Sequence, residues 1–311
     1  MKNPNRLFLL VAFLVFFSGY SQTDQTSVLL RSDDFGMSHA VNMALAEMIE
    51  TNIPFNASVM MTSPWAQEAA DLLRDAPHVA VGLHLTLTSE FEQLKWGPIS
   101  GKSVVPSLVD GRGYFRASVK DFLLSDYDLN EVEVELRAQI ERALAMGMKV
   151  SYLDHHMGIA RSTPEIAAVV EKLAAEYGFV ISRYFNESPT DIWGAPVSEK
   201  LNRVGEKMDH LDENRINLFV FHTAMAHPEI EVLRDLNTNL MTDPDTGASI
   251  IGQHRNAELK VFLSKEFRAY LKGKKLMTYK DLKEQYANSM KRDGVPYESI
   301  EAARLAFSQN E

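Results

Sequence analysis

The stretch from Ser27 to Gly36, SVLLRSDDFG, joins a short apolar run to two adjacent aspartates, Asp33 and Asp34. The apolar run predicts a strand over 27–32 that ends at the two carboxylates. Three later apolar runs also carry side chains that can bind metals, namely His84 in VGLHL, Asp154, His155 and His156 in YLDHH, and His222 in FVFH. The carboxyl ends of parallel strands meet at one end of a β/α barrel, so we expect these side chains to lie close together. Carboxylates and imidazoles grouped in this way indicate a metal-dependent hydrolase.

Strands and helices alternate along the rest of the chain. Strands are predicted at 27–32, 55–61, 79–87, 149–155, 179–185, 216–222 and 275–279, and helices at 39–51, 64–74, 129–146, 164–177, 198–210, 255–272 and 281–291. This alternation predicts an α/β fold with mostly parallel strands joined by right-handed crossovers. Because we find no internal repeat and no low-complexity segment, we expect a single domain over 22–311.

Residues 88–127 interrupt the alternation with a stretch rich in glycine, proline and aromatic residues. A loop of this length inside a compact domain is usually either functional or disordered. Its aromatic content favours an ordered excursion over the site, and a plain surface insertion is the alternative.

Composition excludes several kinds of function. The 311-residue chain has a net charge of −10 and no cysteine. An acidic chain offers nucleic acid no basic surface, so no nucleic-acid partner is expected. Without cysteine there are no disulfides, no thiolate catalysis and no Cys-bound zinc, so a metal must be held by His, Asp and Glu.

The N-terminus has the pattern of a secretory signal peptide. Lys2 and Arg6 precede an apolar run at 7–17 that is short for a membrane span, and small residues suited to cleavage follow it. We interpret 1–21 as a signal peptide rather than as an uncleaved anchor. The mature protein is therefore expected to be exported, periplasmic or secreted, with no membrane span after signal cleavage.

Hydrolysis with a metal needs ligands that leave one coordination position open, a base and an acid. In the aspartate pair, one carboxylate could bind the metal while the other acts as the base, although turns and helix N-termini also favour aspartate. Side chains alternate along a strand, so only one of His155 and His156 is expected to be a ligand. Asp154 shares a face with His156 and could support it as a neighbouring group.

Two further histidines carry alternatives of their own. A lone histidine between leucines, as at His84, is ordinarily a core residue. His222 ends its strand and is a candidate proton donor, or else a structural histidine. The same chemistry at four strand ends makes coincidence a poor explanation for the whole set.

Together these motifs resemble those of the YdjC-like carbohydrate deacetylases, also called the chitooligosaccharide deacetylase family. The matching segments, spread over 28–282, are Asp33-Asp34-Phe35-Gly36, Gly82-Leu83-His84-Leu85-Thr86-Leu87, Pro106-Ser107-Leu108, Gly113-Tyr114-Phe115, Tyr152-Leu153-Asp154-His155-His156, His222, Pro228-Glu229, the helix at Arg255 and Lys275-Leu276-Met277-Thr278-Tyr279. The resemblance implies a distorted, TIM-like β/α barrel with one divalent metal ion. It implies that Asp34, His84 and His156 are the metal ligands. It also implies that Asp33 is the general base for the metal-bound water and that His222 is the acid.

The chain departs from the family pattern in two places. Met157 and Gly158 stand where further histidines are often found, and Thr223 stands where proline commonly follows the late histidine. A His-Pro pair occurs instead at His227, which remains an alternative acid. We prefer His222 because it ends the predicted strand.

The reaction that the resemblance implies is removal of acetyl groups from N-acetylated sugars or oligosaccharides. Trp96, Tyr114 and Phe115 could stack on sugar rings, or could pack the loop. Arg183 could contact substrate or a site carboxylate, or could be a surface arginine.

Other functions remain open at this point. The same side chains could cleave an ester or a phosphoester, or the chain could be a non-catalytic, exported glycan-binding protein. One carboxylate and two imidazoles suit zinc best, with magnesium, cobalt, nickel and manganese as alternatives. The sequence also leaves a homo-oligomer open.

Overall fold

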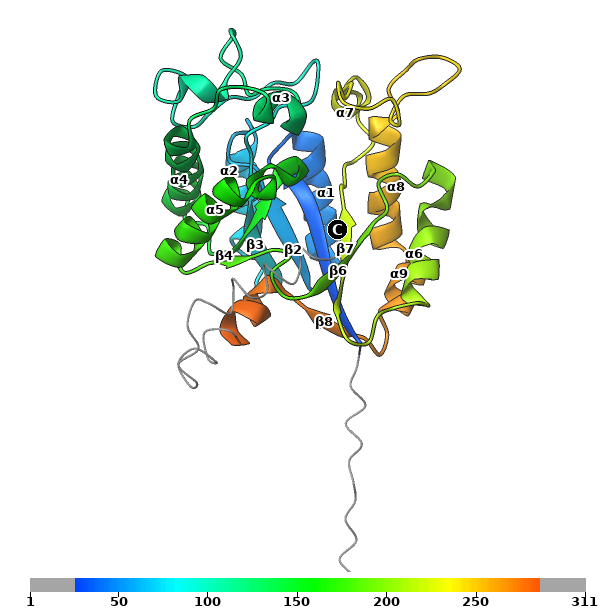
Figure 1. Cartoon of the computed structure of the whole chain (residues 1–311). Helices are drawn as coiled ribbons and strands as arrows, with labels where there is room; N and C mark the ends of the chain where they lie inside the picture. Colours follow the sequence, from blue (N-terminus) through cyan, green and yellow to red (C-terminus); the bar gives the residue numbers. More distant parts are fainter. Residues whose placement is uncertain (1–25, 286–311) are drawn as a thin grey trace, which may run out of the picture.

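The computed structural model describes residues 26–285, so the signal peptide predicted at 1–21 lies outside the described residues. Its centre is one parallel sheet flanked by helices, with long loops gathered at one end (Figure 1). The strands are β1 (Ser27–Phe35), β2 (Phe55–Val59), β3 (Val79–Leu85), β4 (Val150–His155), β5 (Val180–Ile181), β6 (Glu187–Asp191), β7 (Ile216–Phe221) and β8 (Lys275–Met277). The helices are α1 (His39–Glu50), α2 (Ala66–Leu73), α3 (Val119–Leu123), α4 (Leu129–Ala145), α5 (Pro164–Tyr177), α6 (Lys200–Met208), α7 (Pro228–Glu231), α8 (Ile251–Leu263) and α9 (Lys265–Tyr270). Across 26–285, no helix has the length and apolar character that a bilayer crossing needs.

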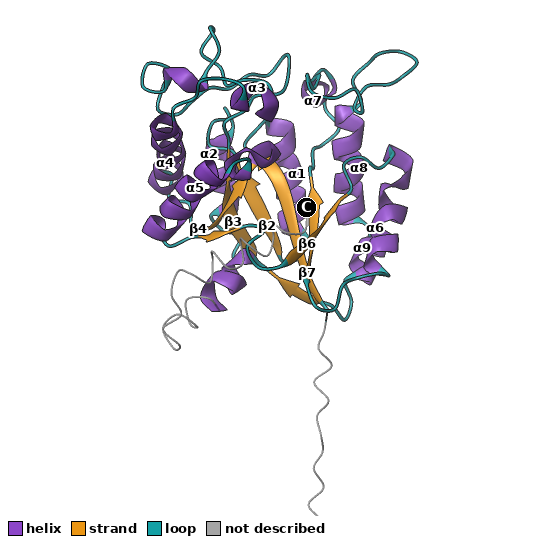
Figure 2. Ribbon diagram, viewed as in Figure 1, coloured by secondary structure: helices purple, strands orange, loops and turns teal. Residues whose placement is uncertain are grey.

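The sheet curls into a barrel that stays open on one side. Hydrogen-bonded neighbours run in the order β5-β4-β3-β2-β1-β7-β6, and β8 pairs with the first residues of β1. Every strand pair in the described chain is parallel, and none of these pairs joins β5 to β6. The predicted α/β fold, a distorted TIM-like barrel of parallel strands, is therefore confirmed, with its distortion in the gap between β5 and β6. Figure 2 shows the orange strands enclosed by purple helices on either side.

The first strand shows how side chains divide between the helices and the barrel interior. Leu30 belongs to the main core, together with Leu45 of α1. Leu29 lies in a second, smaller apolar cluster with Tyr152 of β4. Arg31 shares the face of Leu29, because strand side chains alternate, and it makes its hydrogen bonds inside the barrel. The interior is thus apolar beside Leu29 and becomes polar toward the carboxyl ends of the strands.

Two long connections meet over those carboxyl ends. Residues 88–127 form an ordered loop, and its backbone pairs with the segment that follows α7, where Glu92 N–H donates to the Arg234 carbonyl and Leu236 N–H to the Glu90 carbonyl. In Figure 1 these connections lie at the top, in teal on one side and in yellow to orange on the other. The ordered loop agrees with the predicted excursion over the site.

Several predicted boundaries were wrong. The strand predicted at 179–185 pairs only over β5, because Arg183 and Asn186 have φ angles of 75° and 56°, which end a strand. The helix predicted at 255–272 begins four residues earlier and is divided at Ser264, whose extended backbone ends α8 and caps α9. The helix predicted at 281–291 is helical over 279–285, and the rest of it lies beyond the described residues.

Candidate metal centre and active site

The two aspartates lie inside a bulge at the end of β1, not beyond its end as predicted. β1 continues to Phe35, and its register with β2 shifts between Ser32 and Phe35. Asp34 has a φ of 69°, a left-handed conformation that is uncommon for a residue other than glycine. A bulge re-aims strand side chains, so both neighbouring carboxylates can face one end of the barrel. Backbone strain of this kind concentrates at functional sites.

The three side chains predicted as metal ligands converge at this end of the barrel. Asp34 Oδ1 lies 3.3 Å from His84 Nε2 and 3.3 Å from His156 Nδ1. All three side chains are buried, and among residues 26–285 Asp34 Oδ1 has no hydrogen-bond partner. A buried carboxylate oxygen without a hydrogen bond, facing two imidazole nitrogens, fits the donor set of a divalent metal ion.

Each of these three ligand candidates is held by a second side chain. His84 Nδ1 lies 2.9 Å from Asp154 Oδ2, so Asp154 orients His84 rather than His156, the residue with which it was predicted to share a face. His156 Nε2 lies 2.8 Å from Glu90 Oε2, in the loop over the site. Such outer partners fix the ring orientation and the tautomer of a metal-binding histidine.

An arginine leaves Asp34 with one oxygen free. Arg255 Nη2 donates to Asp34 Oδ2 at 2.7 Å, so Oδ1 is the oxygen that faces the imidazoles. Burial alone would raise the pKa of Asp34, but the Arg255 guanidinium and the two histidines hold it well below its ordinary value. The carboxylate is therefore ionised and directed, as a metal ligand must be.

A second arginine fixes Asp33. Arg31 donates from Nε to Asp33 Oδ1 and from Nη2 to Asp33 Oδ2, both at 2.8 Å. Its Nη1 donates to Asp154 Oδ1 at 2.8 Å. The set Asp33, His84 and Asp154 also has metal-binding spacing. This set fits a metal less well than the Asp34 set, because Arg31 already occupies three of its four carboxylate oxygens.

His222 follows β7 directly and faces Asp33. His222 Nε2 lies 4.0 Å from Asp33 Oδ2, and the indole of Trp193 lies 5.2 Å from the His222 ring. The alternative acid, His227, is exposed and caps α7, where its Nδ1 accepts from Glu229 N–H. The geometry therefore favours His222 over His227.

Two of the three aromatic side chains considered for stacking on sugar rings are buried. Trp96 is 2% exposed, donates its indole N–H to the Thr88 carbonyl and lies 5.9 Å from the His156 ring. Phe115 is also buried, whereas Tyr114 is 38% exposed. Burial favours loop packing for Trp96 and Phe115 and leaves Tyr114 accessible to a ligand.

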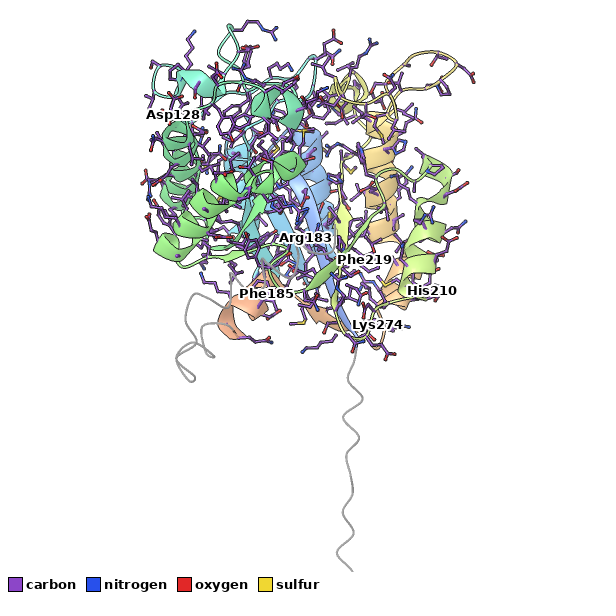
Figure 3. All side chains as sticks on the ribbon, viewed as in Figure 1. Asp128, Arg183, Phe185, His210, Phe219 and Lys274 are labelled. Carbon is purple, nitrogen blue, oxygen red and sulfur yellow. The ribbon has the colours of Figure 1, made fainter. Side chains whose placement is uncertain are left out.

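Arg183 lies in the opening of the barrel, between β5 and β6 (Figure 3). Its backbone N–H donates to Glu187 Oε1 at 2.7 Å, and its buried Nε has no hydrogen-bond partner in the described part of the chain. Its contact with substrate stays a prediction.

Sequence reasoning missed several residues that contact the site. These are Arg31, Glu90, Trp193, Arg255 and Glu258. Only Arg31 left a usable signal, because a charged side chain in an apolar strand, two residues before Asp33, shares its face. The others lie in loops or on α8, where no spacing rule connects them to a strand end.

The fold and the site together define a class, which is a distorted β/α barrel with carboxylate and imidazole groups converging at one end of its strands. Within this class, the chain belongs to the YdjC-like protein family, whose family model matches residues 27–273.

Two relatives align along most of this chain and almost all of their own length. A carbohydrate deacetylase of Brevibacillus brevis is 29% identical over 266 residues, covering 82% of this chain and 99% of the relative. A carbohydrate deacetylase of Listeria monocytogenes is 27% identical over 271 residues, with the same coverage of 82% and 99%. A solved structure from Enterococcus faecalis V583, named a "putative cellobiose-phosphate cleavage protein", has a TM-score of 0.64 at 21% identity and covers 83% of this chain and 99% of that one. This structural likeness supports the fold.

Proposed function

We propose that this protein is a metal-dependent deacetylase that removes acetyl groups from N-acetylated sugars or oligosaccharides. The observation that carries the proposal is the convergence of Asp34, His84 and His156 beside the facing pair of Asp33 and His222. The relatives named carbohydrate deacetylases, which match over nearly their whole length, support the same reaction.

Asp34, His84 and His156 would hold one divalent metal ion. One carboxylate and two imidazoles suit zinc best, with magnesium, cobalt, nickel or manganese as alternatives. When bound, the ion would polarise the acetyl carbonyl as a Lewis acid.

The proton transfers belong to the chain's own residues. Asp33, held in one orientation by both hydrogen bonds from Arg31, accepts a proton from the attacking water. His222 faces it from 4.0 Å and donates a proton to the sugar nitrogen as the carbon–nitrogen bond breaks. The base and the acid thus face each other next to the proposed metal ligands.

The test is acetate release from N-acetylglucosamine oligosaccharides by the mature protein reconstituted with metal. We expect Asp33→Asn, which keeps the shape of the side chain and removes the carboxylate, to lower kcat by about a hundredfold or more. Metal content, measured on the same samples, should be unchanged because Asp33 is not among the proposed ligands.

A matched pair of histidine variants separates the two candidate acids. His222→Gln should lose most acetate release, whereas His227→Gln, at an exposed helix cap, should retain it. No acetate from metal-loaded wild-type protein would refute the deacetylase proposal. In that case, alcohol or phosphate release would favour ester or phosphoester cleavage, and glycan binding without turnover would favour a binding protein.

We also propose that the protein is exported, on the sequence pattern of residues 1–21. Mass spectrometry of the protein from a periplasmic or culture fraction should find an N-terminus near residue 22. Full-length protein confined to the cytoplasmic fraction would contradict export.

A further inference from the structure

Two buried side chains, Lys200 and Glu258, lie behind His222. Lys200, at the start of α6, is 1% exposed, and its Nζ donates to Glu258 Oε1 at 2.9 Å. The same ammonium donates to the carbonyls of Ile192 and Trp193 at 2.9 and 3.1 Å. The second oxygen of Glu258, Oε2, accepts the backbone N–H of His222 at 2.6 Å. All three ammonium protons and both carboxylate oxygens therefore have partners.

The imidazole of His222 faces the same carboxylate. Its Nδ1 lies 4.0 Å from Glu258 Oε2 and, within the described residues, has no hydrogen-bond partner. Its Nε2 lies 4.0 Å from Asp33 Oδ2, on the side of the candidate metal ligands. One nitrogen of the ring thus faces a buried anion, and the other faces the reacting centre.

Stability gives little reason to keep this pair. A fully buried Lys–Glu pair gains little net stability, because the lost hydration of both charges offsets their attraction. Burial raises the pKa of Glu258, and His222 and Lys200 counteract that rise. Lys200 therefore helps to keep a carboxylate charged in a place where an apolar pair would cost the fold less.

We infer that Glu258, kept charged by Lys200, is a positioning residue for His222 that holds the proton on Nδ1 and makes Nε2 the nitrogen that gives up its proton. The inference rests on the role proposed for His222 as the acid. A negative charge beside Nδ1 favours the Nδ1–H tautomer and also the doubly protonated ring that an acid needs. Lys200 has a second effect, because it also anchors the carbonyl of Trp193, whose indole covers the His222 ring.

Other charges surround the ring and have to be held constant in a test. The charged groups near His222 are Asp33 on β1, Glu258 on α8, Lys200 behind Glu258, and Arg255 across the indole of Trp193. Glu258→Gln changes only one of these charges and keeps an acceptor for the His222 N–H. Glu266→Gln, an exposed glutamate on α9, is the control for loss of one negative charge elsewhere.

The first measurement is nitrogen NMR of zinc-loaded protein labelled in histidine, with His222 assigned from the spectrum of His222→Gln. In wild type, neutral His222 should be the Nδ1–H tautomer, and this reading requires neither activity nor a substrate. A predominant Nε2–H tautomer would overturn the inference. If wild type releases no acetate, the proposed function fails. The tautomer would still show whether Glu258 holds the proton on Nδ1 of His222.

The second measurement is the pH dependence of kcat/KM for acetate release. An acid is needed in its protonated form, so activity falls on the alkaline side. Removal of a charge about 4 Å from the ring should move that alkaline limb to lower pH by about one unit in Glu258→Gln, with KM little changed. Lys200→Met removes the cation that keeps the buried Glu258 charged, so it should move the limb in the same direction. If the folded variants lose activity equally at every pH, with no shift of the alkaline limb, Lys200 and Glu258 have only a structural role and the inference is refuted.

Discussion

Metal binding to this protein should release protons, and the number can be worked out from the site. Burial by itself would lower the pKa of His84, but Asp33 and Asp154 raise it to about 9. Burial would lower the pKa of His156 as well, but the neighbouring carboxylates of Glu90 and Asp34 raise that pKa to about 10. In metal-free protein near neutral pH, both rings therefore carry two protons.

A ring nitrogen must lose its proton before it can bind a metal. His84 would lose the proton on Nε2 and keep the one on Nδ1, which lies 2.9 Å from Asp154. His156 would lose the proton on Nδ1 and keep the one on Nε2, which lies 2.8 Å from Glu90. Near pH 7.5 the release is therefore about two protons per metal ion, and affinity should rise by up to about a hundredfold per pH unit until the pH nears the two pKa values.

Titration calorimetry measures this number directly. Zinc is added to chelator-treated protein near pH 7.5 in two buffers of different ionisation enthalpy, and the difference in heat gives the protons released. His155→Gln is the matched control, because burial lowers the pKa of His155 to about 3 and its ring is already neutral. This variant should still release about two protons, whereas His84→Gln should release about one and bind more weakly.

Release of less than about half a proton by wild type would refute the reasoning, because it would mean that both rings are already neutral in the metal-free site. Affinity that does not change between about pH 6.5 and 8.5 would lead to the same conclusion.

Three other predictions follow from single contacts. A Cβ at Gly82 would lie 2.1 to 2.4 Å from ring atoms of Tyr152, so Gly82→Ala should lower the free energy of unfolding by about 1–3 kcal/mol in urea titrations, and a change near zero would contradict the packing. Glu90→Gln removes the charged partner of His156 and should weaken zinc binding by about 10- to 100-fold in a chelator competition, with unchanged affinity as the opposing result. The folded pKa of His155 is about 3, against an unfolded value of 6.5, so its contribution to stability is complete at higher pH and is lost as the pH falls from about 6.5 toward 3. Between about pH 6.5 and 4.5 this loss is at most about 2 kcal/mol, and His155→Gln should remove that part of the pH dependence of unfolding.

The sequence allowed the parallel sheet and the strand-end side chains to be predicted for local reasons. Apolar runs of strand length stand out, and a polar side chain at the end of such a run needs no knowledge of distant contacts. His84, Asp154 and His156 were found in this way. Even so, the end of β1 was misplaced, because a bulge depends on the register with the neighbouring strand, which no local pattern records.

The partners of these side chains could not be predicted, because they come from far along the chain. Arg255 reaches Asp34 across 221 residues, and Glu90 reaches His156 across 66. A helical arginine and a loop glutamate are ordinarily exposed, and nothing in their surroundings in the sequence indicates burial. β6 was missed for a different reason, since its sequence ESPTD has neither an apolar run nor alternation.

Asp33 is proposed as the base and Asp34 as a metal ligand, although both are aspartates. The physical difference between them comes from Arg31 and Arg255. Arg31 donates to both oxygens of Asp33, which fixes its orientation and leaves only further lone pairs free to accept a proton. Arg255 donates to a single oxygen of Asp34 and leaves the other buried and facing two imidazoles. A buried carboxylate oxygen needs positive charge beside it, which the two protonated imidazoles provide in metal-free protein and a metal ion would provide once those protons are lost. The arginine contacts, together with the two imidazoles that face Asp34, therefore distinguish two carboxylates of the same chemistry.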